Sequence, residues 1–134
     1  PLIHSERSLR LLNSIRAVNG KVFLAVRGNT AIDTWCADYY RNDNILVKTG
    51  VQCAEKCDVF VIGDRIVQIY APEEIQKKLD EIYASARKTS DIKIPEIYEK
   101  VYKKKAKVRV VITQNPELAE QVRKQIVDYF TRHE

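Results

Sequence analysis

The sequence predicts an α/β fold: a single domain whose mixed sheet of about five strands includes a β-hairpin and is flanked by helices. Short apolar runs of strand length alternate with longer segments in which apolar residues recur at helical spacing. The connections between several strands are long enough for parallel crossovers. The chain has 134 residues, 45% of them apolar, which is enough for one modest core. One domain over residues 1–134 is therefore expected.

A helix and then an inner strand are expected at the start of the chain. Residues 6–18 place leucine, isoleucine and alanine near helical spacing after Ser5, which suits an N-cap, and Asn19-Gly20 ends this helix. Residues 21–26 (KVFLAV) are a nearly continuous apolar run. Such a run is typical of a strand that is covered on both faces.

A polar loop joins this strand to a second helix. Arg27-Gly28-Asn29-Thr30 follows the apolar run, and residues 31–41 then show helical spacing with one apolar face. Asn42-Asp43-Asn44 breaks that spacing, and residues 45–48 form the next expected strand. Strand, loop, helix and strand in this order favour a parallel crossover.

A β-hairpin is expected over residues 57–70. The segment CDVFVIGD, residues 57–64, is apolar up to Gly63-Asp64, and alternation of apolar and polar residues resumes over residues 65–70. Glycine followed by aspartate between two apolar runs is the signal of a two-residue hairpin turn. This hairpin supplies the antiparallel part of the predicted sheet.

The second half of the chain is mainly helical. Pro72 suits the first turn of a long helix that continues to about Lys88, with acidic residues near its positive end. Residues 95–104 form a further expected helix, residues 107–112 a strand, and Asn115-Pro116 starts the last helix. Together with the hairpin, these elements complete the five expected strands.

Two stretches of the sequence repeat one pattern. KVFLAVRGNTAI and KVRVVITQNPEL each give a lysine, a strand, a polar loop, an asparagine and a helix, so Asn29 and Asn115 occupy equivalent places. Asparagine caps helices well, which explains the pattern without a ligand. The alternative is a ligand site, because loops that lead into helix N-termini collect free N–H donors and open α/β sheets bind ligands there. The residues of this predicted site are Arg27, Asn29, Thr30, Thr113 and Asn115.

Much of the net charge of +5 comes from one basic run. Its residues are Lys100, Lys103, Lys104, Lys105 and Lys107. One interpretation is a solvated helix end, where cations meet the negative end of the helix dipole. The other is a face for nucleic acid or phosphate from Lys100 to Arg109, beside Tyr98 and Tyr102, whose rings would stack on bases. Tyrosines at this spacing also commonly cover a sheet or an interface.

The three cysteines do not match a common metal or disulfide pattern. Cys53 and Cys57 are separated by three residues, and a four-ligand zinc site would need Cys36 and His4 as well. Reduced thiols are expected, with a disulfide between Cys53 and Cys57 as the alternative. No glycine-rich phosphate loop and no Ser-His-Asp grouping stands out in the sequence. No metal and no cofactor is therefore expected.

The order of elements over residues 5–70 resembles half of a phospholipase D-like domain. That family carries His-x-Lys, followed by four residues and Asp, from the first hairpin strand onward. Laying Asp64 on the family's aspartate puts Cys57 at the histidine and Val59 at the lysine. Phosphodiester cleavage there needs an imidazole nucleophile and a lysine on the phosphate oxygens, and neither is present. The resemblance implies a non-enzymatic relative, similar to the effector-sensing domains of archaeal TrmB-like transcription regulators.

The function expected from these observations is regulatory. The domain would capture a small anionic or sugar-like effector and pair as a homodimer, while DNA contact would belong to another region or chain. Methionine is absent, a bias shared by many hyperthermophile proteins, and no apolar stretch reaches the length of a membrane span, so an archaeal, cytoplasmic protein is expected. The alternatives are a nucleic-acid-binding module on the face from Lys100 to Arg109, and a metal-dependent nuclease with Asp58, Asp64 and Glu73 as candidate ligands.

Overall fold

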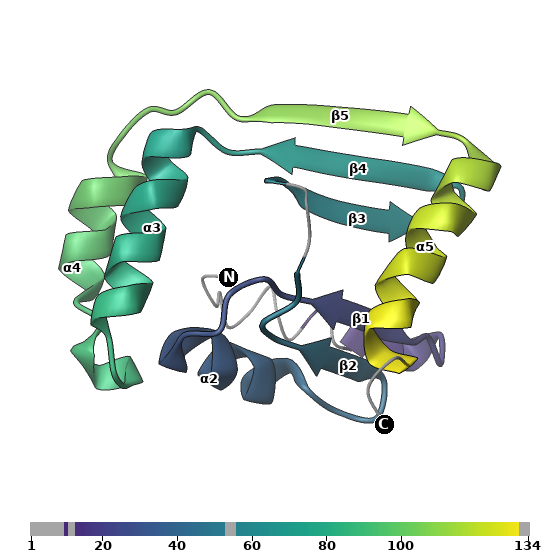
Figure 1. The fold of residues 1–134 in the computed structure, drawn as a ribbon, viewed down its shortest axis with the longest axis horizontal. Coiled ribbons are helices and arrows are strands. Elements are labelled where there is room, and N and C mark those ends of the chain that lie inside the picture. Colours follow the sequence, from purple (N-terminus) through teal and green to yellow (C-terminus); the bar gives the residue numbers. More distant parts are fainter. Residues whose placement is uncertain (1–9, 11–12, 53–55, 132–134) are drawn as a thin grey trace.

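The computed structural model describes residues 10, 13–52 and 56–131, which contain both strands and helices (Figure 1). The strands are β1 (Val22–Ala25), β2 (Ile45–Lys48), β3 (Asp58–Ile62), β4 (Arg65–Tyr70) and β5 (Arg109–Gln114). The helical segments are α2 (Ala31–Tyr40), α3 (Glu73–Ser85), the 3₁₀ turn η1 (Thr89–Asp91), α4 (Ile94–Ile97), the π-helical turn η2 (Tyr98–Tyr102) and α5 (Pro116–Thr131). The predicted α/β class, with its five strands and a hairpin, is confirmed.

The five strands pair in two sheets. β1 and β2 form a parallel pair, and β3, β4 and β5 form an antiparallel sheet with β4 in the middle. The sequence predicts one mixed sheet, whereas the parallel and antiparallel pairings belong to separate ladders. The hydrophobic pattern indicates which face of a strand is buried, but it does not indicate which strand pairs with it. The strands themselves were therefore predictable and their division between two sheets was not.

The unit β1-α2-β2 surrounds one hydrophobic core. Its buried residues are Ala37, Ile45 and Val47, and half-buried side chains of β1 pack against them. β1 is predicted to be covered on both faces, but each of its four residues is only half-buried. Residues 13–17 form the described part of the first predicted helix, and Asn19 ends it with a φ of 48°. The remainder of that predicted helix before residue 13, apart from residue 10, lies outside the described residues.

The hairpin of β3 and β4 turns at Gly63-Asp64, as predicted. Ile62 pairs with Arg65, so the loop contains only these two residues. Gly63 has a φ of 60°, a conformation that residues with side chains rarely adopt. β5 pairs with β4 along its full length and occupies Arg109–Gln114 rather than the predicted residues 107–112.

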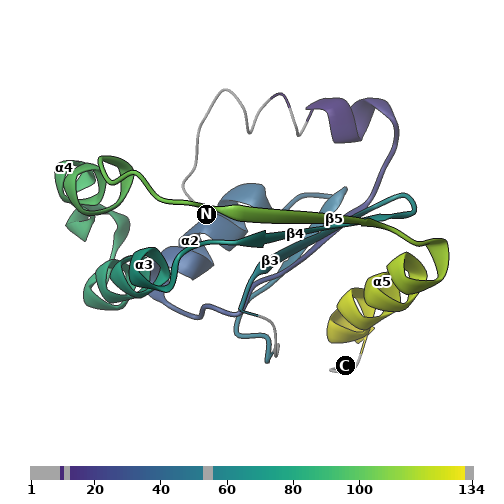
Figure 2. The same ribbon diagram turned by 90° about the horizontal axis from the view of Figure 1, so that it is seen from above.

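Helix α5 connects the two sheets. At its middle, Arg123 donates a hydrogen bond to the carbonyl of Gly63 at 2.5 Å. Near its end, the ring of Phe130 meets that of Phe23 edge to face, with centroids 5.4 Å apart. The helix contacts β1, β3 and β4 and lies on one side of the antiparallel sheet (Figure 2).

Helix α3 and the segment α4-η2 form a helical pair at one end of the antiparallel sheet (Figure 1). α3 begins after Pro72, as predicted, and ends at Ser85 rather than near Lys88. The helix predicted over residues 95–104 is shorter, because α4 gives way to the π-helical turn η2. A second core joins α2 to α3. Its buried residues are Ile32, Cys36 and Ala86.

Candidate ligand-binding site

A shallow hollow lies where the antiparallel sheet meets the helical pair. It has a volume of about 370 Å³ and is open to solvent. Residues of two chain connections line it, the one from β4 to α3 and the one from η2 to β5. The lining residues are Tyr70, Ala71, Pro72, Lys107, Val108 and Arg109.

Strand pairing places an aromatic and a cationic side chain together in this hollow. Tyr70 and Arg109 are partners in the register of β4 and β5, so their side chains project from the same face of the sheet. The Tyr70 hydroxyl accepts a hydrogen bond from Gln68 Nε2 at 3.1 Å. Lys107 lies two positions before Arg109, and both residues are exposed. Apolar walls with one aromatic ring and two cations suit a small anionic ligand.

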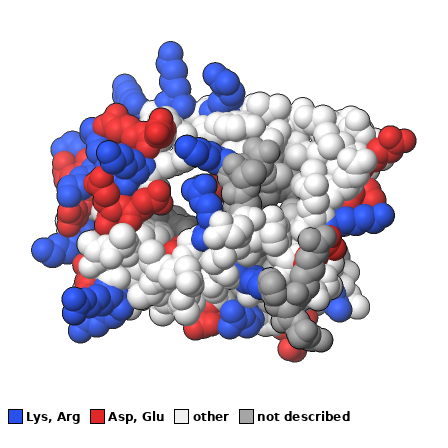
Figure 3. Space-filling model, viewed as in Figure 1, with Lys and Arg blue, Asp and Glu red and all other residues white. Residues whose placement is uncertain are grey.

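Acidic partners neutralise most of the predicted basic run. Three lysines each form an ion pair with a glutamate: Lys100–Glu96, Lys103–Glu99 and Lys104–Glu74. Within the part of the chain that the structure describes, Lys105, Lys107 and Arg109 form no ion pair. Figure 3 shows the contrast: red and blue side chains mix over the helical pair, and blue ones project alone where the chain enters β5. The unneutralised charge therefore lies at the hollow and beside it.

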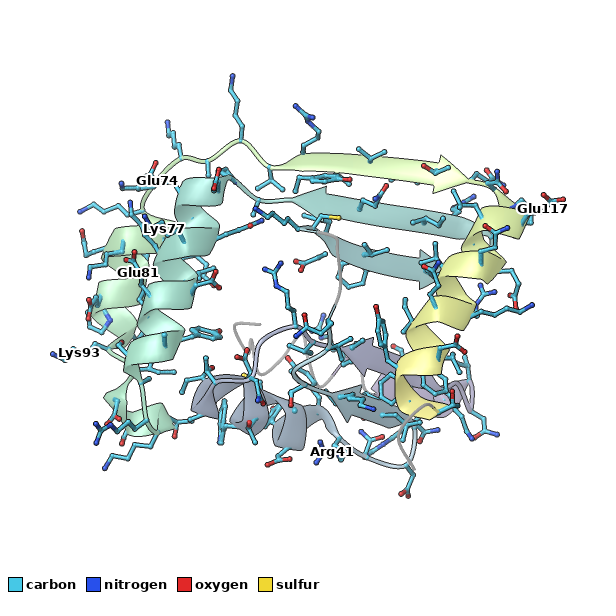
Figure 4. The ribbon with its side chains drawn as sticks, in the orientation of Figure 1. Arg41, Glu74, Lys77, Glu81, Lys93 and Glu117 are labelled. Carbon is cyan, nitrogen blue, oxygen red and sulfur yellow. The ribbon has the colours of Figure 1, made fainter. Side chains whose placement is uncertain are left out.

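Glu74 holds one of these lysines against α3. Figure 4 shows Glu74 at the end of α3 that is nearest the antiparallel sheet. Lys78 lies 2.6 Å and Lys104 3.0 Å from its carboxylate. Hydrogen bonds from Lys78 and then from Lys104 lower the pKa of Glu74 to about 2. The Lys104 ammonium is thus engaged within the protein, unlike those of Lys105 and Lys107.

The structure does not bring the five predicted ligand residues together. Arg27, Asn29 and Thr30 follow β1, whereas Thr113 lies in β5 and Asn115 follows it. β1 and β5 belong to different sheets. Their arrows point in opposite directions in Figure 1. The two groups of residues therefore lie towards opposite sides of the molecule and cannot line one site.

The loop after β1 is closed by its own hydrogen bonds. Thr30, rather than Asn29, is the N-cap of α2 and forms a capping box with Asp33. The Asp33 carboxylate accepts from Thr30 N at 2.9 Å and from Thr30 Oγ1 at 2.7 Å. Asp33 is only 7% exposed. An internal carboxylate thus occupies the helix N-terminus, where an anionic ligand would compete with it.

Gly28 permits this close packing. A Cβ atom on Gly28 would lie 2.3 Å from Asp33 Oδ2, well inside van der Waals contact. The Gly28 carbonyl also accepts a hydrogen bond from Gly50 N at 3.0 Å. This bond ties the loop after β1 to the loop after β2, so the carboxyl ends of both parallel strands are held by protein contacts.

The loop after β5 has a similar structural role. Asn115 Oδ1 accepts a hydrogen bond from Leu118 N at 3.0 Å, so this asparagine caps α5. Its own N–H donates to the carbonyl of Asp64 at 3.0 Å. Thr113 is half-buried in β5. The helix-cap explanation of the repeated pattern therefore holds for Asn115 and is wrong for Asn29.

The acidic residues considered as nuclease ligands are dispersed. Asp58 begins β3 and Asp64 lies in the turn after β3, so the length of the strand separates them. Asp64 accepts a hydrogen bond from Gln114 Nε2 at 2.9 Å, and Glu73 begins α3. Among the described residues, no group of three or more His, Cys, Asp or Glu side chains could hold a metal ion.

Cys36 and Tyr83 belong to the core between α2 and α3. Burial raises the pKa of the Cys36 thiol. The pKa of Tyr83 is raised to about 12, mainly by burial and to a smaller extent by the nearby Cys36 and Asp33. A thiol in this setting is a poor nucleophile. Cys53 and His4 lie outside the described residues. The zinc site and the disulfide considered above both include at least one of these two residues.

The tyrosines beside the basic run do not belong to the core. Tyr98 and Tyr102 are 58% and 57% exposed. Tyr70 is the aromatic residue of the hollow, and its place was not recognised in the sequence. The sequence did contain a signal for the two cations of the hollow, because Glu96–Lys100 and Glu99–Lys103 have the i,i+4 spacing of helical ion pairs. Subtracting those paired lysines leaves the cations that precede β5.

Comparisons of the chain with protein-family models, with curated proteins and with solved structures gave no match. Across the described ranges, no helix has the length and apolar character needed to cross a bilayer. The hollow is therefore assigned on its geometry and charge alone.

Proposed function

We propose that this domain is a non-catalytic, regulatory ligand-sensing module that binds a small anionic ligand in the hollow. One observation carries the proposal: Lys107 and Arg109, unpaired with any described acid, line the hollow together with Tyr70. An anionic group between two such cations gains charge-assisted hydrogen bonds. The ring of Tyr70 and the apolar walls would contact the rest of the ligand, such as a sugar.

The position of the hollow supplies a mechanism for sensing. The connections from β4 to α3 and from η2 to β5 link the antiparallel sheet to the helical pair, and both contribute to the hollow. A ligand that touches both connections stabilises one orientation of the helical pair over others. Binding energy would in this way be converted into a population shift that a partner can detect.

The proposed setting follows the resemblance to phospholipase D-like effector domains. The module would serve a transcription regulator in the cytoplasm of an archaeon, and another region or chain would contact DNA. Chemistry at the hairpin is not part of this proposal, because Cys57 and Val59 stand where the resemblance expects the catalytic histidine and lysine. Ligand binding alone would carry the regulatory signal.

A thermal-shift screen with inorganic phosphate, phosphorylated sugars and neutral sugars tests the proposal. A ligand that binds only the folded state raises its stability, by about 2.7 kcal/mol at a hundredfold excess over Kd. An anionic ligand is expected to raise the melting temperature of the wild type and not that of Lys107→Ala/Arg109→Ala. The matched control is Lys105→Ala/Lys124→Ala, which removes two exposed positive charges outside the lining. Equal loss of the response in both double variants, or no response to any anion, would refute the proposal.

A nucleic-acid-binding module is a second candidate, favoured by one observation. Lys105, Lys107 and Arg109 are exposed at every second position of the segment that enters β5. Three phosphate contacts to a single strand imply an affinity loss of about twentyfold between roughly 50 and 200 mM salt. Titration of a fluorescent oligonucleotide at both salt concentrations measures this. An absence of binding at the lower salt concentration would exclude the candidate.

A further inference from the structure

One face of the antiparallel sheet is rich in exposed apolar side chains. Strand register places Phe60, Val67 and Ile112 in one row across the three strands, and Ile69 and Val110 in the neighbouring row. With Ile62 they form what we call the apolar face. Four of its members are about half exposed or more: Phe60 46%, Val110 54%, Ile112 65% and Ile62 68%.

The other face of the same sheet is more buried, and α5 packs at the end of the sheet that carries the turn between β3 and β4 (Figure 1). Ile66 projects opposite to the apolar face, since side chains alternate along a strand, and it is only 4% exposed. α5 contacts both β3 and β4. The exposed fractions on the apolar face amount to on the order of 400 Å² of apolar surface, within the range of the largest patches on monomeric proteins, which are often functional. An interaction surface therefore remains on this side.

Two opposite charges lie at the two ends of the apolar face. Asp58 shares a row with Ile69 and Val110, and Arg65 shares a row with Ile62. Both are exposed. Neither forms an ion pair with another described residue. Consider a second copy of the face, turned by 180° about an axis that runs across the strands and laid on the first copy. Its strands run in the opposite direction, so its Asp58 end lies over the Arg65 end of the first copy.

We propose that the apolar face binds the same face of a second copy of this chain, related by a two-fold axis that runs across the strands. Asp58 of each copy then faces Arg65 of the other, and the rows containing Phe60 and Val67 meet at the centre. Sheets that pack face to face cross at about 30°, which this arrangement accommodates. Self-complementary charge is the requirement of a two-fold interface, and it singles out a second copy as the occupant.

The interface is independent of the proposed ligand site. Tyr70 and Arg109 project from the opposite face to their neighbours Ile69 and Val110, so the hollow stays open in the pair. Two apolar faces with their rims would bury on the order of 1,000 Å², the lower end for a specific interface. Dimerisation in the micromolar range is therefore expected.

Analytical ultracentrifugation over about 1 to 300 µM protein tests the proposal. The wild type is expected to form dimers as concentration rises, and Ile112→Lys to raise the dimer dissociation constant by about tenfold or more. Val111→Lys is the matched control, because Val111 is its neighbour in β5, projects from the opposite face and is 38% exposed. Circular dichroism establishes that both variants are folded. A wild type that stays monomeric, or equal weakening by both variants as edge-to-edge pairing of β5 would give, would overturn the proposal.

Charge reversal tests the two-fold arrangement itself. Asp58→Arg and Arg65→Asp each bring like charges together across the interface, and each is expected to weaken the dimer by about threefold to tenfold. The double variant Asp58→Arg/Arg65→Asp restores opposite charges and is expected to recover wild-type association. Two single variants that weaken the dimer, with no recovery in the double variant, would contradict the arrangement.

Discussion

The loop after β1 and the segment that enters β5 both carry polar residues beside a strand, but they use them differently. In the loop, the Asp33 carboxylate is buried and accepts two hydrogen bonds from Thr30. In the segment, Lys107 and Arg109 are exposed without an ion pair to a described residue. The comparison teaches that polar residue types at a strand end do not by themselves indicate a ligand site. The polar groups of the loop are satisfied within the protein, whereas the two cations of the segment remain available to a ligand of the hollow.

The largest expected effect is at Gly28. Gly28→Ala is expected to lower the free energy of unfolding by about 3 kcal/mol, because the new methyl group displaces the Asp33 carboxylate and breaks the capping box. Urea denaturation followed by circular dichroism measures this change. The result would show that the loop is packed too tightly to admit a ligand.

Two comparisons distinguish the overlap of the Gly28→Ala methyl group with the Asp33 carboxylate from any loss of stability caused by a glycine-to-alanine substitution itself. Gly63→Ala, where no atom lies within 4 Å of the added Cβ, is expected to cost about 1 kcal/mol, because its φ is 60°. In an Asp33→Ala background, Gly28→Ala is expected to cost less than about 1 kcal/mol, since the overlapping carboxylate is gone. A loss of about 3 kcal/mol in both backgrounds would contradict the overlap.

Removal of the internal carboxylate is expected to have the next largest effect. Asp33→Ala should lower the free energy of unfolding by about 2 kcal/mol, because Thr30 N and Thr30 Oγ1 lose their acceptor in a buried setting. Asp38→Ala on the same helix is the control. Its exposed ion pair with Arg41, at 2.8 Å, is worth less than about 0.5 kcal/mol. Equal losses in the two variants would remove the special role of Asp33.

The cations of the hollow are expected to matter far less for stability. Lys107→Ala/Arg109→Ala should change the free energy of unfolding by no more than about 0.5 kcal/mol, because neither side chain has an ion pair with a described residue to lose. Urea denaturation under the conditions used for Gly28→Ala gives the comparison directly. A loss above about 1 kcal/mol would show that these cations serve the fold rather than a ligand.

The smallest expected effect is a change in the pKa of Glu74. This pKa distinguishes the lysines that pair with Glu74 from those that do not. Its pKa in the folded protein is lowered to about 2 from 4.5, so its ion pairs contribute fully above pH 4.5 and are lost as the pH falls towards 2. Lys78→Ala is expected to raise the pKa of Glu74 towards 4.5, more than Lys104→Ala does, and Lys105→Ala to leave it unchanged. Carboxyl chemical shifts in an NMR titration report these values. An unchanged pKa in Lys78→Ala would contradict the assigned ion pair.

Local signals predicted most of the fold. The turn at Gly63-Asp64 and the start of α3 after Pro72 follow from backbone preferences that act within a few residues, and both are observed. The division of five strands between two sheets depends on contacts distant in the sequence, which periodicity does not encode. Thr30 and Asn29 are both acceptable caps, so only the structure decides between them.

The candidate site was less predictable than the fold. The prediction grouped two strand-end loops because both would lie at one edge of a single sheet, and β1 and β5 instead belong to different sheets. The basic run was recognised, but Lys104 is neutralised by Glu74, which lies far from it in the sequence. Tyr70 joins Lys107 and Arg109 only through the register of β4 with β5.

The most direct test of the central claim is an NMR titration of the ¹⁵N-labelled protein with inorganic phosphate, in which backbone amide shifts locate the anion. The account expects saturable changes at the amides of Tyr70, Ala71 and residues 107–109, with those of residues 27–30 unchanged. Changes confined to residues 27–30, or no saturable change at millimolar phosphate, would contradict it.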